Sequence, residues 1–159
     1  AFLKEVRRLF PGRTLLGSGD LFTAADCVRM LRETGVDGVT AARGSIGNPW
    51  IFSQAAALLR GELMLQPPTV HEQRDVICEH FRLAEQILPR DQVSKQLRKF
   101  CIHYSPWHPD ADAVRAAFIG VRNADEWHQV ISDHYAEERP GQYPADPGNS
   151  GQAQAVSCC

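Results

Sequence analysis

Two turns of small residues, each at the end of a short apolar segment, constrain the fold of this chain more than any other feature. The first lies in Leu15-Leu-Gly-Ser-Gly-Asp-Leu21, and the second lies in Val39-Thr-Ala-Ala-Arg-Gly-Ser-Ile-Gly-Asn-Pro-Trp50. We predict strands over residues 14–17 and 36–42, with one amphipathic helix between them. A strand, a helix and a second strand within about thirty residues predict a βαβ unit, whose strands are parallel.

The two turns follow successive strands, so we expect them at the same edge of the sheet, where α/β folds bind ligands. For Gly17-Ser-Gly-Asp20 alone, a plain βα turn is the simpler explanation. In Ala41-Ala-Arg-Gly-Ser45, Arg43 can meet a phosphate as a planar two-pronged donor, and the alternative is a surface arginine on a loop. Their occurrence at successive strand ends favours a phosphate site, like those formed by the last two strand–helix loops of (β/α)₈ barrels.

Capping signals set the expected helix ends in this first part of the chain. Thr23 opens the helix between the strands, with Asp26 at the capping-box position, and Gly35 ends it. After the second strand, we expect Asn48 to cap a helix that begins at Pro49 and stops at Gly61. A further amphipathic helix precedes the first strand.

The composition changes at the linker Gln66-Pro-Pro-Thr69, after which the sequence is helical in pattern. Thr69 and Glu72 form a second capping box, and the Pro-containing segment 105–109 breaks the helical pattern. Beyond Glu138 the residues are mostly Pro, Gly, Gln and Ser, which predicts disorder. The expected division is therefore 1–65, 66–138 for a helical domain, and 139–159 for a disordered tail.

Composition and cysteine usage exclude several classes of protein. The 159 residues are 43% hydrophobic with a net charge of −2, which predicts a soluble globular protein without a general attraction to nucleic acid. No apolar run is long enough for a membrane span. The five cysteines form no C-x-x-C pair, and the two Cys-x-His pairs do not match zinc spacing, so we expect no metal and a cytoplasmic location. We discount the terminal Cys158-Cys159 as a lipidation signal.

A basic stripe is the second candidate site. Lys95, Arg98 and Lys99 lie at i, i+3 and i+4 and share one face of a predicted helix, where they could follow a phosphate backbone. The alternative is a solvated helix face. Three nearby aromatic residues could stack on bases, although core packing is the simpler explanation of Tyr104, Trp107 and Trp127.

Taken together, these segments resemble the C-terminal part of the tRNA-dihydrouridine synthase family. That family carries Asn-Gly-Asp after its seventh barrel strand, Gly-Arg-Gly after its eighth, and then Gly-Asn-Pro-Trp. The corresponding residues here are Ser18-Gly19-Asp20, Ala42-Arg43-Gly44 and Gly47-Asn48-Pro49-Trp50. Arg98-Lys-Phe-Cys-Ile-His-Tyr104 is similar to a basic-then-aromatic segment of the family's helical domain, and the resemblance covers residues 1–135.

The resemblance implies an FMN-dependent oxidoreductase, with the last two βα units of a TIM barrel followed by a helical bundle. In the family, NADPH reduces FMN, hydride passes to a uridine of tRNA, and a cysteine donates a proton. The resemblance assigns the FMN phosphate to Ser18, Gly19, Asp20, Ala42, Arg43 and Gly44, and RNA contacts to Lys95, Arg98 and Lys99. We expect the full-length protein to be a monomer.

Two substitutions depart from the family pattern, namely Ser18 in place of Asn and Ala42 in place of Gly. Both keep small side chains, so a backbone-mediated phosphate site is retained. The segment with the catalytic cysteine would precede Ala1, and Cys27 is not that residue, so we expect this chain alone to be inactive. The alternatives are another FMN-dependent barrel oxidoreductase that acts on a small molecule and a non-catalytic RNA-binding module.

Overall fold

The computed structural model describes residues 2–63 and 65–145. The chain divides into two compact units, with the boundary between Gln66 and Pro67. We refer to them as the N-terminal unit and the helical unit, and we describe each by itself.

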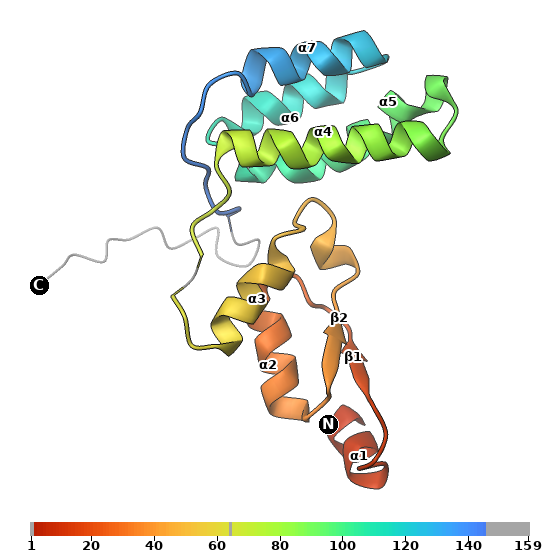
Figure 1. Ribbon diagram of the computed structural model, residues 1–159, viewed down its shortest axis with the longest axis vertical. Helices are drawn as coiled ribbons and strands as arrows, with labels where there is room; N and C mark the ends of the chain where they lie inside the picture. The colour runs from red at the N-terminus through yellow and green to blue at the C-terminus, as the bar shows by residue number, and fades with distance from the viewer. Residues whose placement is uncertain (1, 64, 146–159) are drawn as a thin grey trace, which may run out of the picture. The chain divides into compact units, whose positions relative to one another are not determined.

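The N-terminal unit contains a βαβ arrangement, as predicted. Figure 1 shows α2 alongside the two strands. The strands β1 and β2 are parallel, and Gly17 pairs with Val39 at the centre of the register. The elements in chain order are α1 (Phe2–Leu9), β1 (Leu16–Ser18), α2 (Ala24–Thr34), β2 (Gly38–Thr40), the 3₁₀-helix η1 (Arg43–Ser45) and α3 (Ile51–Leu59).

Both strands differ from their predicted bounds, 14–17 and 36–42, because side chains and turns limit the ladder at each end. At the first end, the Asp37 carboxylate accepts a hydrogen bond from the Leu15 N–H at 2.8 Å. At the other end, Gly19 adopts a φ of 123° and the chain turns away from β1. After Thr40, the chain turns through Ala42 into η1. The strands are therefore three residues each, followed directly by the two predicted turns.

The capping box at Thr23 and Asp26 is confirmed, and Gly35 ends α2 in the left-handed conformation. The buried face of α2 packs with residues from the turns and from α3 in one cluster. Cys27 belongs to this cluster and is 1% exposed, and burial raises the pKa of its thiol. The cluster consists of Leu21, Ala24, Cys27, Val28, Ala41, Ile51 and Ala55.

The predicted start of the third helix is wrong. α3 begins at Ile51, its N-cap is Trp50, and no side chain caps it. Asn48 instead lies in a turn, in which its N–H donates to the Ser45 carbonyl at 3.1 Å. Its Oδ1 is buried without a hydrogen-bond partner among the described residues. Asn48 therefore faces the protein and leaves the first turn of α3 without a side-chain cap.

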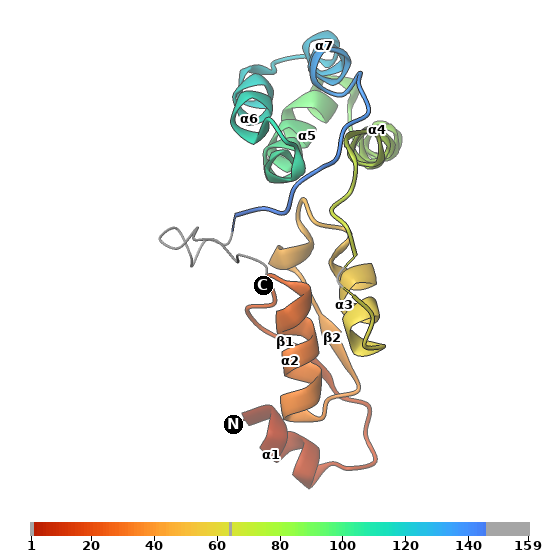
Figure 2. The ribbon, with the colours of Figure 1, turned by 90° about the vertical axis from the view of Figure 1, so that its left-hand side faces the viewer.

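The helical unit contains α4 (Val70–Ile87), α5 (Arg90–Tyr104), the 3₁₀-helix η2 (Ser105–Trp107), α6 (Ala111–Gly120) and α7 (Ala124–His134). Figure 2 shows several of these helices nearly end-on, grouped side by side. The capping box at Thr69 and Glu72 is confirmed. The core of this unit consists of buried side chains from all four α-helices and includes Ile77, Phe81, Ala84, Leu97, Cys101, Val114, Phe118 and Trp127.

Two buried polar side chains connect the elements of the helical unit. Gln73 on α4 is fully buried, and its Nε2 donates to the carbonyls of Pro68 at 2.8 Å and Trp107 at 2.9 Å. His108 is also fully buried, and its Nε2 lies 2.9 Å from the His134 carbonyl. Its Nδ1 accepts a hydrogen bond from the Asp110 N–H at 3.0 Å, so the neutral ring satisfies both neighbours.

The disorder predicted from residue 139 onward is wrong for residues 139–145, and residues 146–159 lie outside the described part of the chain. The Val70 N–H donates to the Arg139 carbonyl at 2.9 Å, and the Gln142 N–H donates to the Trp107 carbonyl at 2.8 Å. Arg139 also pairs with Asp110 at 2.5 Å. These contacts order the segment despite its polar composition.

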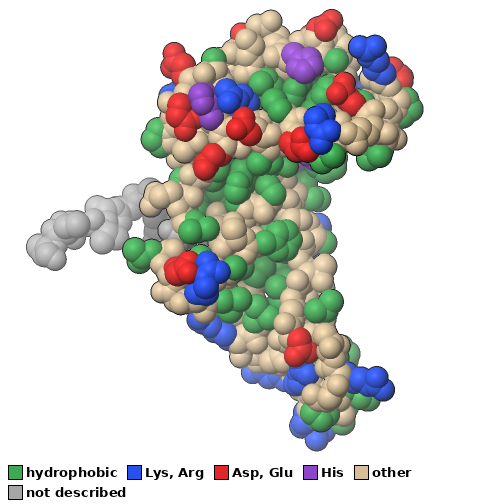
Figure 3. All heavy atoms as spheres, viewed as in Figure 1, with side chains coloured by type: hydrophobic (Ala, Val, Ile, Leu, Met, Phe, Trp, Pro, Cys, Tyr) green, Lys and Arg blue, Asp and Glu red, His purple; other side chains and the backbone are tan. Residues whose placement is uncertain are grey.

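Large hydrophobic side chains reach the surface mainly in the N-terminal unit. Figure 3 shows several on the face that it displays. The exposed ones include Phe2, Leu9, Phe10, Leu16, Phe22, Ile46, Phe52, Leu59 and Leu63. Among the described residues, no helix has the length and apolar character needed to cross a membrane.

Candidate functional site

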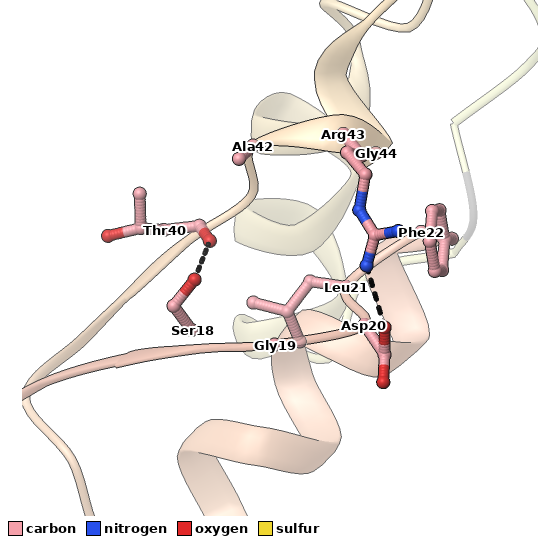
Figure 4. A pocket seen from close by; sticks show the side chains of 9 residues that line it. All are labelled: Ser18, Gly19, Asp20, Leu21, Phe22, Thr40, Ala42, Arg43 and Gly44. Atoms are coloured by element: carbon pink, nitrogen blue, oxygen red, sulfur yellow. Dashed lines mark hydrogen bonds and ion pairs between the residues drawn. The ribbon is translucent and has the colours of Figure 1, made fainter.

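The two turns that follow β1 and β2 line one pocket of about 80 Å³. Figure 4 shows their side chains around it. The volume is far below the roughly 300–1,000 Å³ of a pocket that encloses a whole drug-sized ligand. The pocket has room for one small group, such as a phosphate. Its lining comprises Ser18, Gly19, Asp20, Leu21, Phe22, Thr40, Ala42, Arg43 and Gly44.

Gly44 allows the two turns to approach each other closely. A Cβ atom at this position would lie 1.9 Å from the Leu21 carbonyl oxygen and 2.8 Å from the Phe22 Cα. These are backbone atoms, which cannot move aside by a change of rotamer. The pocket therefore requires glycine at residue 44, and the contact fixes the separation of the two turns.

The first turn has an unusual backbone. Gly19 and Asp20 both have positive φ, at 123° and 48°, and Asp20 is the sole non-glycine with positive φ among residues 2–63 and 65–145. Aspartate tolerates this conformation better than most residues because its short polar side chain can form local hydrogen bonds. The two residues turn the chain so that the Asp20 carboxylate faces the second turn (Figure 4).

The Arg43 guanidinium lies between two residues of the first turn (Figure 4). Its Nη2 donates to the Asp20 Oδ1 at 3.0 Å, and its Cζ lies 5.3 Å from the centre of the Phe22 ring. The Arg43 and Asp20 side chains are 72% and 84% exposed, so water weakens this ion pair. The guanidinium is held at the surface of the pocket with several N–H donors still available.

The backbone of the second turn also offers donors. Among the described residues, the N–H groups of Arg43 and Gly44 have no hydrogen-bond acceptor, because they lie at the start of η1. The Ser18 hydroxyl donates to the Thr40 carbonyl at 3.2 Å. Two amides and a guanidinium at one small pocket are donors suited to a phosphate.

All six residues predicted for the phosphate site line this pocket. Sequence reasoning missed Leu21, Phe22 and Thr40, which also line it. Thr40 immediately precedes the second turn, and Phe22 follows the first. Their position next to the predicted residues is the sequence signal that could have identified them as pocket residues. The stacking of Phe22 on Arg43 depends on the contact between the turns and has no local signature.

The predicted basic stripe divides into two kinds of residue. Lys95 and Lys99 are exposed on α5. Arg98 is half-buried, and its Nη1 donates to the carbonyl of Val121 at 3.2 Å. Val121 directly follows the end of α6. Arg98 therefore contributes to the packing of the helical unit, and the two lysines remain as exposed cations.

Aromatic and cysteine residues near this stripe belong to the core. Tyr104, Trp107 and Trp127 are 6%, 3% and 1% exposed, which confirms core packing. The Trp127 Nε1 donates to the Cys101 Sγ at 3.4 Å, and burial raises the pKa of that thiol to about 12. Within residues 2–63 and 65–145, no group of three or more His, Cys, Asp or Glu side chains is arranged to hold a metal ion.

Comparison with known proteins identifies the family. The family model described as dihydrouridine synthase matches residues 2–138. The chain belongs to the dihydrouridine synthase family. A probable tRNA-dihydrouridine synthase of Mycobacterium tuberculosis (strain CDC 1551 / Oshkosh) is 35% identical over 126 residues, which are 79% of this chain and 32% of that protein.

Two further relatives agree with this assignment. The probable tRNA-dihydrouridine synthase of Mycobacterium leprae (strain TN) is 32% identical over 126 residues, again 79% of this chain and 32% of the relative. The tRNA-dihydrouridine synthase B of Xanthomonas axonopodis pv. citri (strain 306) is 28% identical over 131 residues, 82% of this chain and 40% of the relative. The chain thus spans about a third of the mycobacterial synthases that it matches.

Proposed function

We propose that this chain is part of an FMN-dependent tRNA-dihydrouridine synthase, which reduces uridine to dihydrouridine in tRNA with NADPH. In this proposal, residues 1–65 supply the last two βα units of a TIM barrel and residues 66–138 supply a helical domain that contacts tRNA. The family match and the names of the relatives support it. The pocket between the two turns carries the proposal, because it brings together residues that lie 23 positions apart.

The pocket suits the phosphate of FMN in both size and donors. Its volume of about 80 Å³ admits a phosphate group and leaves the flavin ring outside this pair of turns. Gly44 brings the turns into contact, and its N–H and that of Arg43 are available for phosphate oxygens. Arg43 adds a positive charge at the rim, which favours the dianion.

When bound, FMN supplies the hydride that reduces the uridine. The residues of this chain would bind and orient its phosphate, because the two turns hold amide and guanidinium donors at adjacent strand ends. Cys27, Cys78 and Cys101 do not line the pocket. We infer that the proton donor for uridine lies elsewhere in the full-length protein and that this chain alone is inactive.

Removal of the Arg43 side chain tests the cofactor site. In the full-length protein, Arg43→Ala should weaken FMN binding by about 1.5–3 kcal/mol, because a charge-assisted contact to phosphate is lost. The measurement is flavin absorbance that remains with the protein after gel filtration. Arg32→Ala is the matched control, because Arg32 is an exposed arginine on α2 outside the pocket. Full FMN retention by Arg43→Ala would remove Arg43 from the site.

The RNA surface is tested with the two exposed lysines of α5. Lys95→Ala with Lys99→Ala should weaken tRNA binding and reduce its salt dependence by about one to two units of slope, because each phosphate contact releases counterions. Arg98 is left intact because its bond to the Val121 carbonyl would confuse binding with folding. The control is Arg115→Ala with Arg122→Ala, which removes the same charge from exposed positions on and after α6.

Flavin reduction by NADPH should be the same in both double variants, because that half of the reaction needs no RNA. An unaltered salt slope in the lysine variant would place the RNA surface elsewhere. Together with normal flavin reduction, it would favour an oxidoreductase that acts on a small molecule.

A further inference from the structure

The backbone of Asp20 is unusual for a solvent-exposed aspartate. Its φ of 48° lies in the left-handed region, and its side chain is 84% exposed. Left-handed backbone is strained in residues other than glycine, although less in aspartate than in most. No burial of the side chain offsets this strain. Such a conformation persists where surrounding contacts enforce it, and it often marks a functional position.

The contacts around Asp20 hold its side chain against the side chain of Arg43. The Gly44 backbone meets the Leu21 carbonyl so closely that the two turns have little freedom to separate. The Asp20 Oδ1 accepts from one Arg43 nitrogen at 3.0 Å, while the Phe22 ring covers the guanidinium at 5.3 Å. Arg43 thus has an acceptor on one side and an aromatic face on another (Figure 4).

We propose that Asp20 is a positioning residue that holds the Arg43 guanidinium at the rim of the phosphate pocket. This inference rests on the proposed phosphate site, and it changes the role of Asp20 within it. A carboxylate repels a phosphate dianion, so direct contact between the two is unfavourable. The bond to Asp20 uses one of the five N–H donors of Arg43, and the remaining donors can reach a phosphate oxygen.

Asp20 lowers the cost of ordering Arg43 when the ligand binds. A free arginine side chain loses rotamer freedom on binding, whereas one already held by a hydrogen bond and a ring loses less. The high exposure of the pair limits the gain, because exposed ion pairs contribute little. We therefore expect an effect of about two- to fivefold on affinity, the range typical of such pairs.

Two substitutions of Asp20 distinguish the effect of its hydrogen bond to Arg43 from the effects of its negative charge and of its left-handed backbone. Asp20→Asn keeps an oxygen acceptor and tolerates the left-handed backbone, but it removes the negative charge. Asp20→Gly also accepts this backbone, but it removes the acceptor. Neither variant strains the turn, so a difference between them reports the bond to Arg43 rather than misfolding.

The first measurement needs no ligand. The order parameter of the Arg43 Nε–H bond, from ¹⁵N relaxation of the full-length protein without FMN, should exceed that of the exposed Arg32. It should fall to the Arg32 value in Asp20→Gly and stay near the wild-type value in Asp20→Asn. The proposal is overturned if Arg43 is as mobile as Arg32 in the unaltered chain, or if Asp20→Gly leaves it unchanged.

The second measurement compares FMN with riboflavin, which lacks the phosphate, in the full-length protein. FMN should bind about two- to fivefold more weakly to Asp20→Gly than to Asp20→Asn, while riboflavin binds both equally. Equal or tighter FMN binding by Asp20→Gly than by Asp20→Asn would show that the side-chain acceptor of residue 20 does not aid binding, and it would overturn the positioning role. If the unaltered protein binds riboflavin as tightly as FMN, the proposed phosphate site itself is wrong, whatever the order parameters show.

Discussion

Replacement of Gly44 by alanine should destabilise the N-terminal unit and open the candidate pocket. The new Cβ would lie 1.9 Å from the Leu21 carbonyl oxygen, and even tight Cβ contacts in proteins are no closer than 3.0 Å. The backbone of the first turn must therefore withdraw by more than an ångström. Overpacking of this kind costs roughly 1–3 kcal/mol. We expect the upper part of this range because the obstacle is backbone rather than a movable side chain.

Hydrogen exchange read by mass spectrometry can localise the effect. Amides of β1, β2 and α2 should exchange roughly tenfold faster in Gly44→Ala for each 1.4 kcal/mol of lost stability, while α4–α7 are unchanged. Gly12→Ala is the matched control, because a Cβ there meets nothing within 4 Å. If Gly44→Ala exchanges like Gly12→Ala, the close contact between the turns does not limit the structure, and our account of the pocket fails.

Two predictions concern the helical unit. Burial lowers the pKa of His108 below its ordinary 6.5, so the unfolded state binds its proton more readily. The stability that neutral His108 contributes should be full above pH 6.5 and should fall as the pH drops below it. Thermal melts should therefore show a smaller loss of stability at low pH in His108→Gln. Part of the loss should remain, because burial also lowers the pKa of His80. Gln73→Leu removes the Gln73 donor from the buried Pro68 carbonyl and one of two donors from the Trp107 carbonyl, and it should cost about 1–3 kcal/mol in urea unfolding. Gln86→Leu on the exposed face of α4 should cost little.

Local signals in the sequence predicted much of this fold. Both capping boxes, at Thr23 and Thr69, depend on residues three positions apart, and both are present. The predicted N-cap at Asn48 is wrong because the Asn48 N–H donates to the Ser45 carbonyl in a turn and the Asn48 side chain is buried. The ordering of residues 139–145 was also missed, because it depends on acceptors in η2 and donors at the start of α4 that lie far away in the sequence.

The candidate site shows the same limit. Small residues after two strands identified the positions of the pocket, because parallel strands end at one edge. The pairing of Arg43 with Asp20 could not be predicted, since it depends on a left-handed residue and on the approach of the turns at Gly44. Likewise, the helical spacing placed Arg98 beside Lys95 and Lys99, but only the position of α6 determines which of them is covered.

The hydrogen bond between the Val70 N–H and the Arg139 carbonyl brings the start of α4 next to the segment that follows α7. His71 reinforces this junction through Ala136 and Glu138. A domain whose two ends adjoin can be attached to a host protein, or inserted into one of its loops, without being stretched or unfolded. The four helices between residues 70 and 139 thus begin and end at one point, so they could be grafted by design onto a host with both junctions side by side.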